Sequence, residues 1–550
     1  MLHSHFELLA CLRPERLYFS GHRQVIPLSP DRLRHEFNLE VRALTTRIRR
    51  ISQIAFFFLF VWLLARAKMN YSSGADTRTL HPVNYFFKLD PLVSLVNLLA
   101  GHALYLTLTW SLVILIPTFF LGRFFCGWIC PLGSLNQFLG GIRSKSMGRK
   151  ALIEANRYKK WQTAKYFLLI AGLLAALFRG SIVGWIDPFS LLVRSMGVSI
   201  LPAAASKKYY VVYQPHYWPS VMMGAVFLAL LLMNLRVTRF WCRALCPLGA
   251  LLGVAARWSF LGLHKDTTTC NQCSRCMINC QGGDDPIGGA PWHKAECHLC
   301  MNCVEACPHG SLEFRFFRKL QTPPEVVGTN LSRRRALIAA VTGLAVVPLL
   351  RAQSALGKSR NERLIRPPGA LDETDFLSRC IRCGECVRAC PNNALQLAFT
   401  EAGLMGLWSP VVTPKIGYCE PSCVLCSEVC PTGAIQEMTP RQKGWIAVEG
   451  IASTPLLIGT AVYDQRLCLP WAKATDCVVC LEWCPVAPKA IYVKDAMVMD
   501  AEGKPRMLKQ PHIDLNRCVG CGACEFACPL QEQPGVYVTS SGESRSRLRS

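Results

Sequence analysis

Long apolar stretches separated by polar segments dominate the first half of the chain. Four of them, residues 51–67, 98–122, 166–183 and 221–235, contain few charged residues. Their lengths approach the roughly 20 residues that cross a bilayer as a helix. The pattern therefore predicts four membrane-spanning helices. The alternative is a set of buried core helices in a soluble protein, but apolar runs of this length with so few charges are rare in such folds.

Charge and composition agree with a membrane protein. Hydrophobic residues make up 51% of the chain and charged residues 18%, and the formal net charge is +25. No basic run interleaved with aromatic residues is present, which argues against nucleic-acid binding. The segments 1–50, 68–97, 123–163, 184–218 and 236–335 instead contain nine, three, eight, three and thirteen Lys and Arg residues. Because cytoplasmic loops are rich in these residues, we expect a multi-pass protein of the bacterial inner membrane with a cytoplasmic N-terminus.

A fifth apolar stretch, residues 336–350, follows the cluster Ser332-Arg333-Arg334-Arg335. An arginine cluster before a short run of small apolar residues is typical of a twin-arginine export signal. An ordinary anchor helix and a buried helix of a soluble domain are the alternatives. Both the export signal and the anchor place the following residues outside the cytoplasm, so the C-terminal part is expected in the periplasm.

The membrane region contains an internal repeat. Each copy begins with Asp-Pro, at Asp90 and Asp187, continues through an apolar stretch, and ends in a Cys-x3-Cys-Pro-Leu-Gly motif. The motif cysteines are Cys126 and Cys130 in the first copy and Cys242 and Cys246 in the second. Both copies run from outside to inside, so this is a parallel repeat whose cysteine pairs meet the cytoplasmic interface.

The two Asp-Pro pairs allow two interpretations. In the structural one, Asp caps a helix and Pro takes the first helical position. In the functional one, Asp90 and Asp187 accept protons at a quinol site near the external face, because ionisable groups at membrane depth often serve proton transfer.

Twenty-four of the 29 cysteines fall into six groups of four. The inner segment carries Cys270, Cys273, Cys276 and Cys280, then Cys297, Cys300, Cys303 and Cys307. The C-terminal part carries Cys380, Cys383, Cys386 and Cys390; Cys419, Cys423, Cys426 and Cys430; Cys468, Cys477, Cys480 and Cys484; and Cys518, Cys521, Cys524 and Cys528. Cys11 stands alone in the polar leader.

The spacing Cys-x2-Cys-x2-Cys-x3-Cys-Pro is the bacterial ferredoxin run, in which the fourth cysteine ligates the other cluster of a pair. Zinc sites instead use widely separated Cys-x2-Cys pairs. We therefore expect six [4Fe–4S] clusters, with crossed ligation in the inner segment: Cys270, Cys273 and Cys276 with Cys307, and Cys297, Cys300 and Cys303 with Cys280. The four C-terminal runs could pair as neighbours or be nested, and two regular runs flanking two irregular ones favour nesting. Gly384, Gly520 and Gly522 allow the loops to bend closely around the clusters.

The cysteine pairs of the repeat are harder to interpret. Cys126, Cys130, Cys242 and Cys246 could jointly hold another metal centre, form a redox-active dithiol, or be buried structural thiols. The chain has no Cys-x-x-Cys-His haem site and no dinucleotide or flavin fingerprint after a strand, so it lacks the parts for nicotinamide chemistry.

These motifs resemble two known proteins joined in one chain. Residues 45–320, with four expected spans, two Cys-x3-Cys-Pro motifs and two ferredoxin runs, are similar to the membrane polyferredoxins of periplasmic nitrate reduction and methylamine utilisation (NapH and MauN type). Residues 330–535 resemble their exported four-cluster partner (NapG and MauM type). The resemblance implies electron flow from membrane quinol to a periplasmic oxidoreductase or cytochrome. The long gap between Cys468 and Cys477 departs from the family's run and makes Cys468 the least secure ligand.

The resulting prediction is an α-helical membrane bundle of four spans plus a fifth connecting span, with α+β ferredoxin-like domains on both sides. Its domains are a cytoplasmic leader (1–45), the membrane domain (46–262), a cytoplasmic two-cluster ferredoxin (263–320), the export-like segment (330–352) and a periplasmic four-cluster ferredoxin (360–550). The expected function is electron transfer, with quinol dehydrogenase activity as its enzymatic form. The alternative is an assembly or maintenance factor that reduces a metal or cofactor of a partner oxidoreductase.

Overall fold

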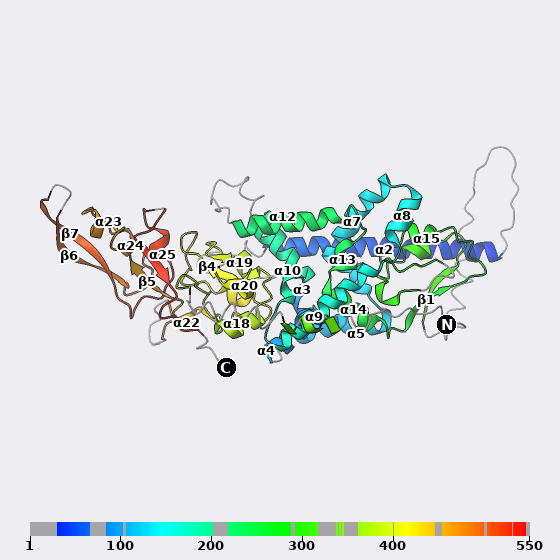
Figure 1. The fold of residues 1–550 in the computed structure, drawn as a ribbon, viewed down its shortest axis with the longest axis horizontal. Helices are drawn as coiled ribbons and strands as arrows, with labels where there is room; N and C mark the ends of the chain where they lie inside the picture. The colour runs from blue at the N-terminus through cyan, green and yellow to red at the C-terminus, as the bar shows by residue number, and fades with distance from the viewer. Residues whose placement is uncertain are drawn as a thin grey trace, which may run out of the picture. The chain divides into compact units, whose positions relative to one another are not determined.

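The structure is a computed structural model that describes residues 30–66, 84–102, 106–201, 218–287, 292–316, 361–399, 401–445, 454–499, 503–530 and 532–545, with parts of 337–345. Cys11, the Ser332–Arg335 cluster and most of the fifth apolar stretch lie outside these residues. The chain divides into two compact units, Met1–Thr45 and Thr46–Ser550. Everything that follows concerns the second unit and the helix that enters it (Figure 1).

Apolar helices form the N-terminal half of the second unit. The longer ones are α2 (Pro30–Arg66), α4 (Pro91–Gly101), α5 (Leu112–Leu121), α7 (Pro131–Ser146), α9 (Ala164–Leu177), α12 (Trp218–Met233) and α14 (Pro247–Ala256). Shorter pieces connect them: α3 (Asn84–Lys88), η1 (Leu106–Ser111), α6 (Phe124–Trp128), α8 (Arg149–Asn156), η2 (Lys160–Thr163), η3 (Val183–Trp185), α10 (Pro188–Leu192), η4 (Val193–Ile200) and α13 (Phe240–Ala244).

The prediction of a four-span membrane bundle is wrong. Among the described residues, one helix, Arg42–Ala65 within α2, is long and apolar enough to cross a membrane. The stretch 98–122 is not continuous, because α4 ends at Gly101 with His102 in a left-handed conformation and α5 begins only at Leu112. Helix α9 has 14 residues and α12 has 16, which gives lengths of about 21 and 24 Å. The fold is instead a mixed helical structure with few strands and ferredoxin domains.

The sequence repeat is also a structural repeat. Asp90 and Asp187 each cap a helix whose first residue is proline, α4 and α10, as the structural interpretation predicted. At the other end of each copy, a five-residue helix, α6 or α13, carries the first motif cysteine. The second motif cysteine, Cys130 or Cys246, then occupies the N-cap position of α7 or α14.

The ferredoxin parts consist of short helices and two-stranded antiparallel sheets. In the inner part, β1 (Leu261–Lys265) pairs with β2 (Leu312–Phe316) and closes residues 261–316 into one unit. It contains α15 (Arg275–Ile278), η5 (Lys294–Glu296) and α16 (Asn302–Glu305).

The C-terminal part has three such sheets: β3 (Leu395–Leu397) with β4 (Pro410–Val412), β5 (Thr460–Tyr463) with β8 (Val536–Thr539), and β6 (Ile491–Met499) with β7 (Pro505–Ile513) (Figure 1). Its helices are α18 (Glu373–Arg379), α19 (Glu385–Ala389), α20 (Gly403–Gly406), α21 (Leu425–Glu428), α22 (Pro440–Lys443), α23 (Leu469–Ala472), α24 (Val479–Glu482) and α25 (Ala523–Phe526). Because β5 and β8 are about 70 residues apart in sequence, their pairing ties the last two cysteine runs into one body.

Candidate metal centres

The inner ferredoxin brings its two cysteine runs together in the crossed manner that the sequence predicted. One cavity is lined by Cys270, Cys273 and Cys276 of the first run and Cys307 of the second. The other group contains Cys280 of the first run beside Cys300 and Cys303 of the second. Burial, followed by the carboxylate of Asp284 and these two neighbouring thiols, raises the pKa of Cys280 well above its usual value. The fourth cysteine of each run therefore lies with the first three of the other run.

The C-terminal runs pair as neighbours, and the nested arrangement that their spacing favoured is wrong. One cavity joins Cys390 to the next run, and another joins Cys484 to the last run; their linings include Cys390, Cys419, Cys423 and Cys426, and Cys484, Cys518, Cys521 and Cys524. A third cavity is lined by Cys468, Cys477, Cys480 and Cys528. Cys468 thus lies beside its predicted partners despite the eight-residue gap before Cys477.

The remaining group contains Cys380, Cys383, Cys386 and Cys430. Burial, followed by the neighbouring thiols Cys383, Cys380 and Cys430, raises the pKa of Cys386 well above its usual value. Thiols of this kind lose their protons when iron binds, so metal binding and proton release are coupled. This group completes the neighbour pairing of the third and fourth runs.

These four cavities resemble one another in size. Their empty volumes are about 330 Å³ in three cases and 380 Å³ in the fourth. The loops between the cysteines curl in the same way, because the second residue after the first cysteine and the residue directly after the second cysteine take a positive φ in several runs. Gly520 and Gly522, at 74° and 87°, are examples, and a Cβ on Gly520 would lie 2.5 Å from the carbonyl oxygen of Gly459. The residues present therefore suit compact four-thiolate clusters.

The repeat cysteines form a separate buried group. The thiol of Cys246 lies within electrostatic range of Cys242, Cys126 and Cys130, so all four motif cysteines approach one another. Their exposed fractions are 6–8%. The side chains of Arg123 and Arg239, one from each copy, lie among them.

Asp90 and Asp187 also meet in the interior. Both side chains are fully buried, and their carboxyl groups lie within hydrogen-bonding range of each other. One oxygen of each accepts backbone N–H groups at the start of its helix. The other oxygens, Asp90 Oδ2 and Asp187 Oδ1, receive no hydrogen bond from a donor in the described part of the chain. A single proton shared by the two carboxyl groups would satisfy both, because two adjacent carboxylates cannot both ionise without water.

The first C-terminal cysteine loop packs on η3 and η4, which flank the helix α10 that Asp187 caps. A Cβ on Gly184 would lie 2.1 Å from the carbonyl oxygen of Ile381, so backbone touches backbone there. The fully buried guanidinium of Arg194 donates to the carbonyl oxygens of Gly184 and Arg382 at 3.2 and 3.0 Å. Arg382 in turn donates to the carbonyl oxygen of Ser181. These contacts fix the Cys380–Cys383 loop against η3 and η4.

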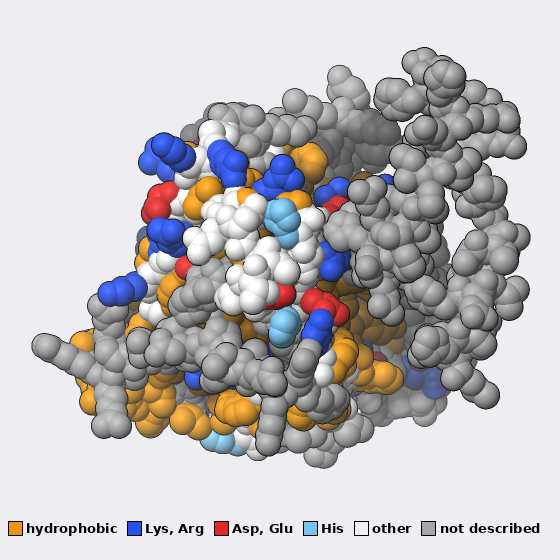
Figure 2. All heavy atoms as spheres, turned by 90° about the vertical axis from the view of Figure 1, so that its right-hand side faces the viewer, with side chains coloured by type: hydrophobic (Ala, Val, Ile, Leu, Met, Phe, Trp, Pro, Cys, Tyr) orange, Lys and Arg blue, Asp and Glu red, His pale blue; other side chains and the backbone are white. Residues whose placement is uncertain are grey.

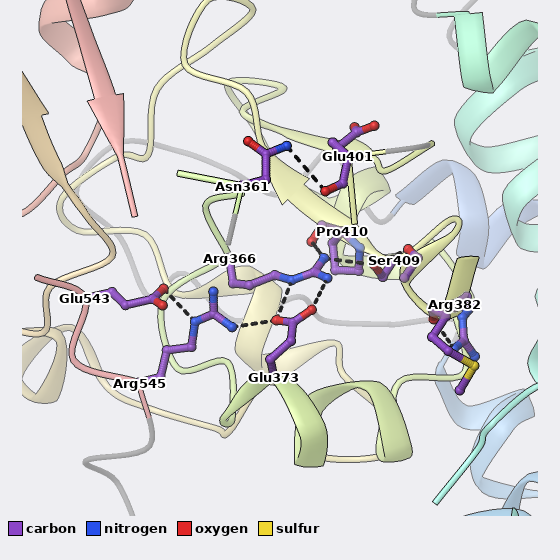
Figure 3. A network of polar contacts seen from close by, with 11 residues as sticks. Asn361, Arg366, Glu373, Arg382, Glu401, Ser409, Pro410, Glu543 and Arg545 are labelled. Carbon is purple, nitrogen blue, oxygen red and sulfur yellow. Dashed lines mark hydrogen bonds and ion pairs between the residues drawn. The ribbon is translucent and has the colours of Figure 1, made fainter. Parts of the chain in front are cut away.

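A network of polar contacts lies at the start of α18 in the same ferredoxin part (Figure 3). Glu373 at the start of α18 receives two hydrogen bonds from Arg366, at 3.1 and 2.6 Å, and one from Arg545 at 2.5 Å. Although burial opposes it, the charge of Arg366 and then that of Arg545 lower the pKa of Glu373 to about 2. The network joins residues near the beginning and the end of the C-terminal part.

Sequence reasoning missed the buried basic side chains around these sites. Arg123 and Arg239 occupy equivalent places in the two repeat copies, three residues before the first motif cysteine, and this equivalence was a signal for a shared role. Arg194 and Arg382 had no such signal, since their partners are backbone carbonyl groups from distant segments.

Comparison with known proteins agrees with this architecture. Three family models, each described as a 4Fe-4S binding domain, match residues 103–150, 217–263 and 424–446; 290–313 and 376–396; and 509–530. The methylamine utilization ferredoxin-type protein MauM of Methylorubrum extorquens is 36% identical over 197 residues, which is 35% of this chain and 80% of MauM. The ferredoxin-type protein NapG of Escherichia coli is 34% identical over 217 residues, 39% of this chain and 87% of NapG.

The chain belongs to the MauM and NapG family of ferredoxin-type proteins. A putative electron transport protein of Escherichia coli, YccM, is 28% identical over 196 residues, and the chain covers 50% of its length. No solved structure matches the chain. Together with the cysteine cavities, the family assignment identifies an iron–sulfur protein of electron transfer that binds [4Fe–4S] clusters.

Proposed function

We propose that this protein holds six [4Fe–4S] clusters in its ferredoxin runs and transfers electrons from membrane quinol to a periplasmic redox partner. The N-terminal half would then correspond to a membrane component of the NapH and MauN type. The bound clusters supply one-electron transfer. Oxidation of one quinol to quinone releases two electrons and two protons, so the protein must accept electrons one at a time and must also hold protons.

The observation that carries the proposal is the packing of the first C-terminal cysteine loop against the helical segment that begins at Asp187. Asp187 caps α10, and Arg194 lies about two turns further along the same helical segment. Arg194 reaches the Cys380–Cys383 loop through the carbonyl oxygen of Arg382. A proton acceptor at the start of a helical segment and a cluster loop bound by a buried arginine further along it suit a reaction that separates protons from electrons.

The length and contacts of α2 support attachment to a membrane. Near the start of its apolar part, Arg49 donates to Asn302 of the inner ferredoxin at 2.9 Å. About 22 Å further along, the carbonyl oxygen of Leu64 accepts from Arg388 of the C-terminal ferredoxin at 3.4 Å. The two ferredoxin parts thus contact opposite ends of Arg42–Ala65, the one helix in the described part of the chain that is long and apolar enough to span a bilayer.

Exposed apolar side chains provide the surface for lipid. Ile51, Ile54 and Phe58 of α2 are 57–66% exposed, and α5 and α12 expose further large residues, including Val113, Ile116, Leu228 and Leu232. Figure 2 shows hydrophobic side chains gathered along the lower edge of one end of the molecule, below an area with many Lys and Arg side chains. Exposed apolar surface of this extent marks a membrane or partner contact. If the end of the molecule that is rich in Lys and Arg faces the cytoplasm, the inner ferredoxin lies in the cytoplasm and the C-terminal ferredoxin lies in the periplasm.

The test replaces the titratable groups of the pair by their isosteric amides. We expect Asp90→Asn and Asp187→Asn to lower quinol oxidation by a factor on the order of 100 or more, which is the contribution typical of a proton acceptor. Cluster content should be unchanged, since Asn caps helices about as well as Asp. The measurements are quinol-dependent reduction of the visible chromophore and iron per chain in membranes.

Asp495→Asn, on the exposed side of β6, is the matched control and should retain full activity. Full activity in both single variants and in the double variant would reject the aspartate pair as the proton acceptor. Wild-type protein with intact clusters and no quinol oxidation would instead favour the assembly-factor alternative.

A further inference from the structure

The two repeat copies bring their four motif cysteines to one buried place. Cys126 and Cys242 lie within the short helices α6 and α13, and Cys130 and Cys246 lie at the N-caps of α7 and α14. Cys246 Sγ accepts the backbone N–H of Gly249 at 3.2 Å. The four thiols therefore come from two equivalent half-sites that face each other.

One arginine from each copy of the repeat reaches the half-site of the other copy. Arg123 of the first copy has Nη2 4.0 Å from Cys126 Sγ and 2.8 Å from where a Cβ on Gly249 of the second copy would lie. Arg239 of the second copy donates to the carbonyl oxygen of Cys126 at 3.1 Å and lies 3.8 Å from the same point on Gly133 of the first copy. Gly249 thus makes room for Arg123, whereas a Cβ on Gly133 would meet the carbonyl oxygen of Cys126 at 2.7 Å, the same oxygen that accepts from Arg239.

These buried positive charges have few negative partners among the residues that the structure describes. Arg123 has one carboxylate, Glu296, at 3.7 Å, which also pairs with Lys165. Arg239 donates to two neutral acceptors, the carbonyl oxygen of Cys126 and Gln137 Oε1 at 2.7 Å. The Nε atoms of both arginines have no hydrogen-bond partner among the described residues. Burying unpaired charge is costly, so this arrangement is suited to an anionic group at its centre.

The inner ferredoxin contributes a buried histidine beside the repeat cysteines. His298 lies between Cys297 and Cys300, is 2% exposed, and has no partner for either ring nitrogen in the described part of the chain. Its carbonyl oxygen would lie 2.1 Å from a Cβ on Gly127, the residue after Cys126. The loop of the inner ferredoxin therefore packs on the half-site of the first copy.

We propose that Cys126, Cys130, Cys242 and Cys246 together hold a seventh iron–sulfur cluster, shared between the two copies of the repeat. A cubane with four thiolates carries a net charge of about −2 in its oxidised form and would balance Arg123 and Arg239. The matches of the 4Fe-4S binding domain to residues 103–150 and 217–263 include both half-sites.

The decisive experiment counts iron and acid-labile sulfide in the anaerobically purified full-length protein. Seven cubanes give about 28 of each per chain, whereas the six ferredoxin quartets alone give about 24. The double variant Cys126→Ala/Cys242→Ala should lose about four of each and keep the rest, and Cys11→Ala should lose none. Native mass spectrometry of the same samples should show the loss of one whole cluster.

Several results would overturn the proposal. They are a content of about 24 iron atoms per chain in the wild type, an equal iron content in the wild type and the double variant, or zinc in place of the additional iron. Two further thiols that appear only after reduction would identify a disulfide instead. If the double variant loses all of its clusters, Arg239→Gln provides the second test. This variant should keep all of the iron and should lower the reduction potential of one cluster. An unchanged set of potentials would contradict the proposal. None of these measurements depends on quinol oxidation, so a failure of the proposed function is distinguishable.

Discussion

Single residues decide how the ferredoxin parts attach to the helical half. Gly127 and Gly184 both lie where a Cβ would come within 2.1 Å of a carbonyl oxygen, that of His298 in one case and that of Ile381 in the other. Contacts this close admit only glycine, and the obstructing atom belongs to the backbone, which cannot rotate away. These two glycines therefore mark the contacts of the inner and C-terminal ferredoxin loops, respectively.

We predict that Gly184→Ala loosens the C-terminal ferredoxin without removing its clusters. The added methyl group must displace the Ile381 carbonyl and with it the Cys380–Cys383 loop, at a cost of about 1–3 kcal/mol. Hydrogen exchange of residues 380–386 should become faster while iron content stays at the wild-type value. Gly148→Ala is the control, because a Cβ there meets nothing within 4 Å. Equal exchange in the two variants would contradict the role assigned to Gly184.

At the scale of elements, the sequence predicted local features well and long-range features poorly. The Asp-Pro pairs specified helix starts at α4 and α10, because capping depends only on neighbouring residues. Apolar composition did not show that the stretch 98–122 is broken after Gly101. The pairing of Cys390 with the run at Cys419 depends on how β3, β4 and the loops fold together, which spacing alone does not determine. The convergence of Arg123 and Arg239 on the repeat cysteines required the two copies to be placed face to face.

The network at the start of α18 makes a pH-dependent contribution to stability. The pKa of Glu373 is about 2, below its usual value of 4.5, so its charge stabilises the fold above about pH 4.5 and this effect is lost as the pH falls towards 2. We predict that Glu373→Gln lowers stability by about 1–2 kcal/mol, a value reduced because about a third of the side chain meets solvent.

The measurement for Glu373→Gln is the temperature at which the cluster chromophore bleaches. The variant should bleach a few degrees below the wild type, by an equal interval at pH 6, 7 and 8, since Glu373 stays ionised throughout this range. An interval that shrinks between pH 8 and pH 6 would show that the carboxyl group titrates much higher than its contacts imply. Arg506→Gln is the control, because its ion pair with Asp476 is exposed on both sides and should contribute little.

At the scale of the whole molecule, α2 relates the two ferredoxin parts to one axis. Arg49, beside the inner ferredoxin, lies next to Arg50 and close to Arg47, whereas Leu64, near the other end of the helix, contacts the C-terminal ferredoxin. If this helix crosses the bilayer, the basic end faces the cytoplasm and the two ferredoxin parts lie on opposite sides. The orientation then follows from one helix and its contacts, without the four-span bundle that hydropathy alone suggested.

This orientation predicts which surfaces a protease can reach in intact spheroplasts. An epitope tag inserted after Gly148, an exposed residue before α8 in the helical half, should be protected, whereas a tag added after Ser550 should be digested. After lysis both tags should be digested, which controls for resistance of the folded protein itself. Both insertions keep the full chain, so cluster content can be measured to show that the tagged protein is intact. Digestion of the Gly148 tag in intact spheroplasts, or protection of the C-terminal tag, would reverse the orientation and with it the delivery of electrons to a periplasmic partner.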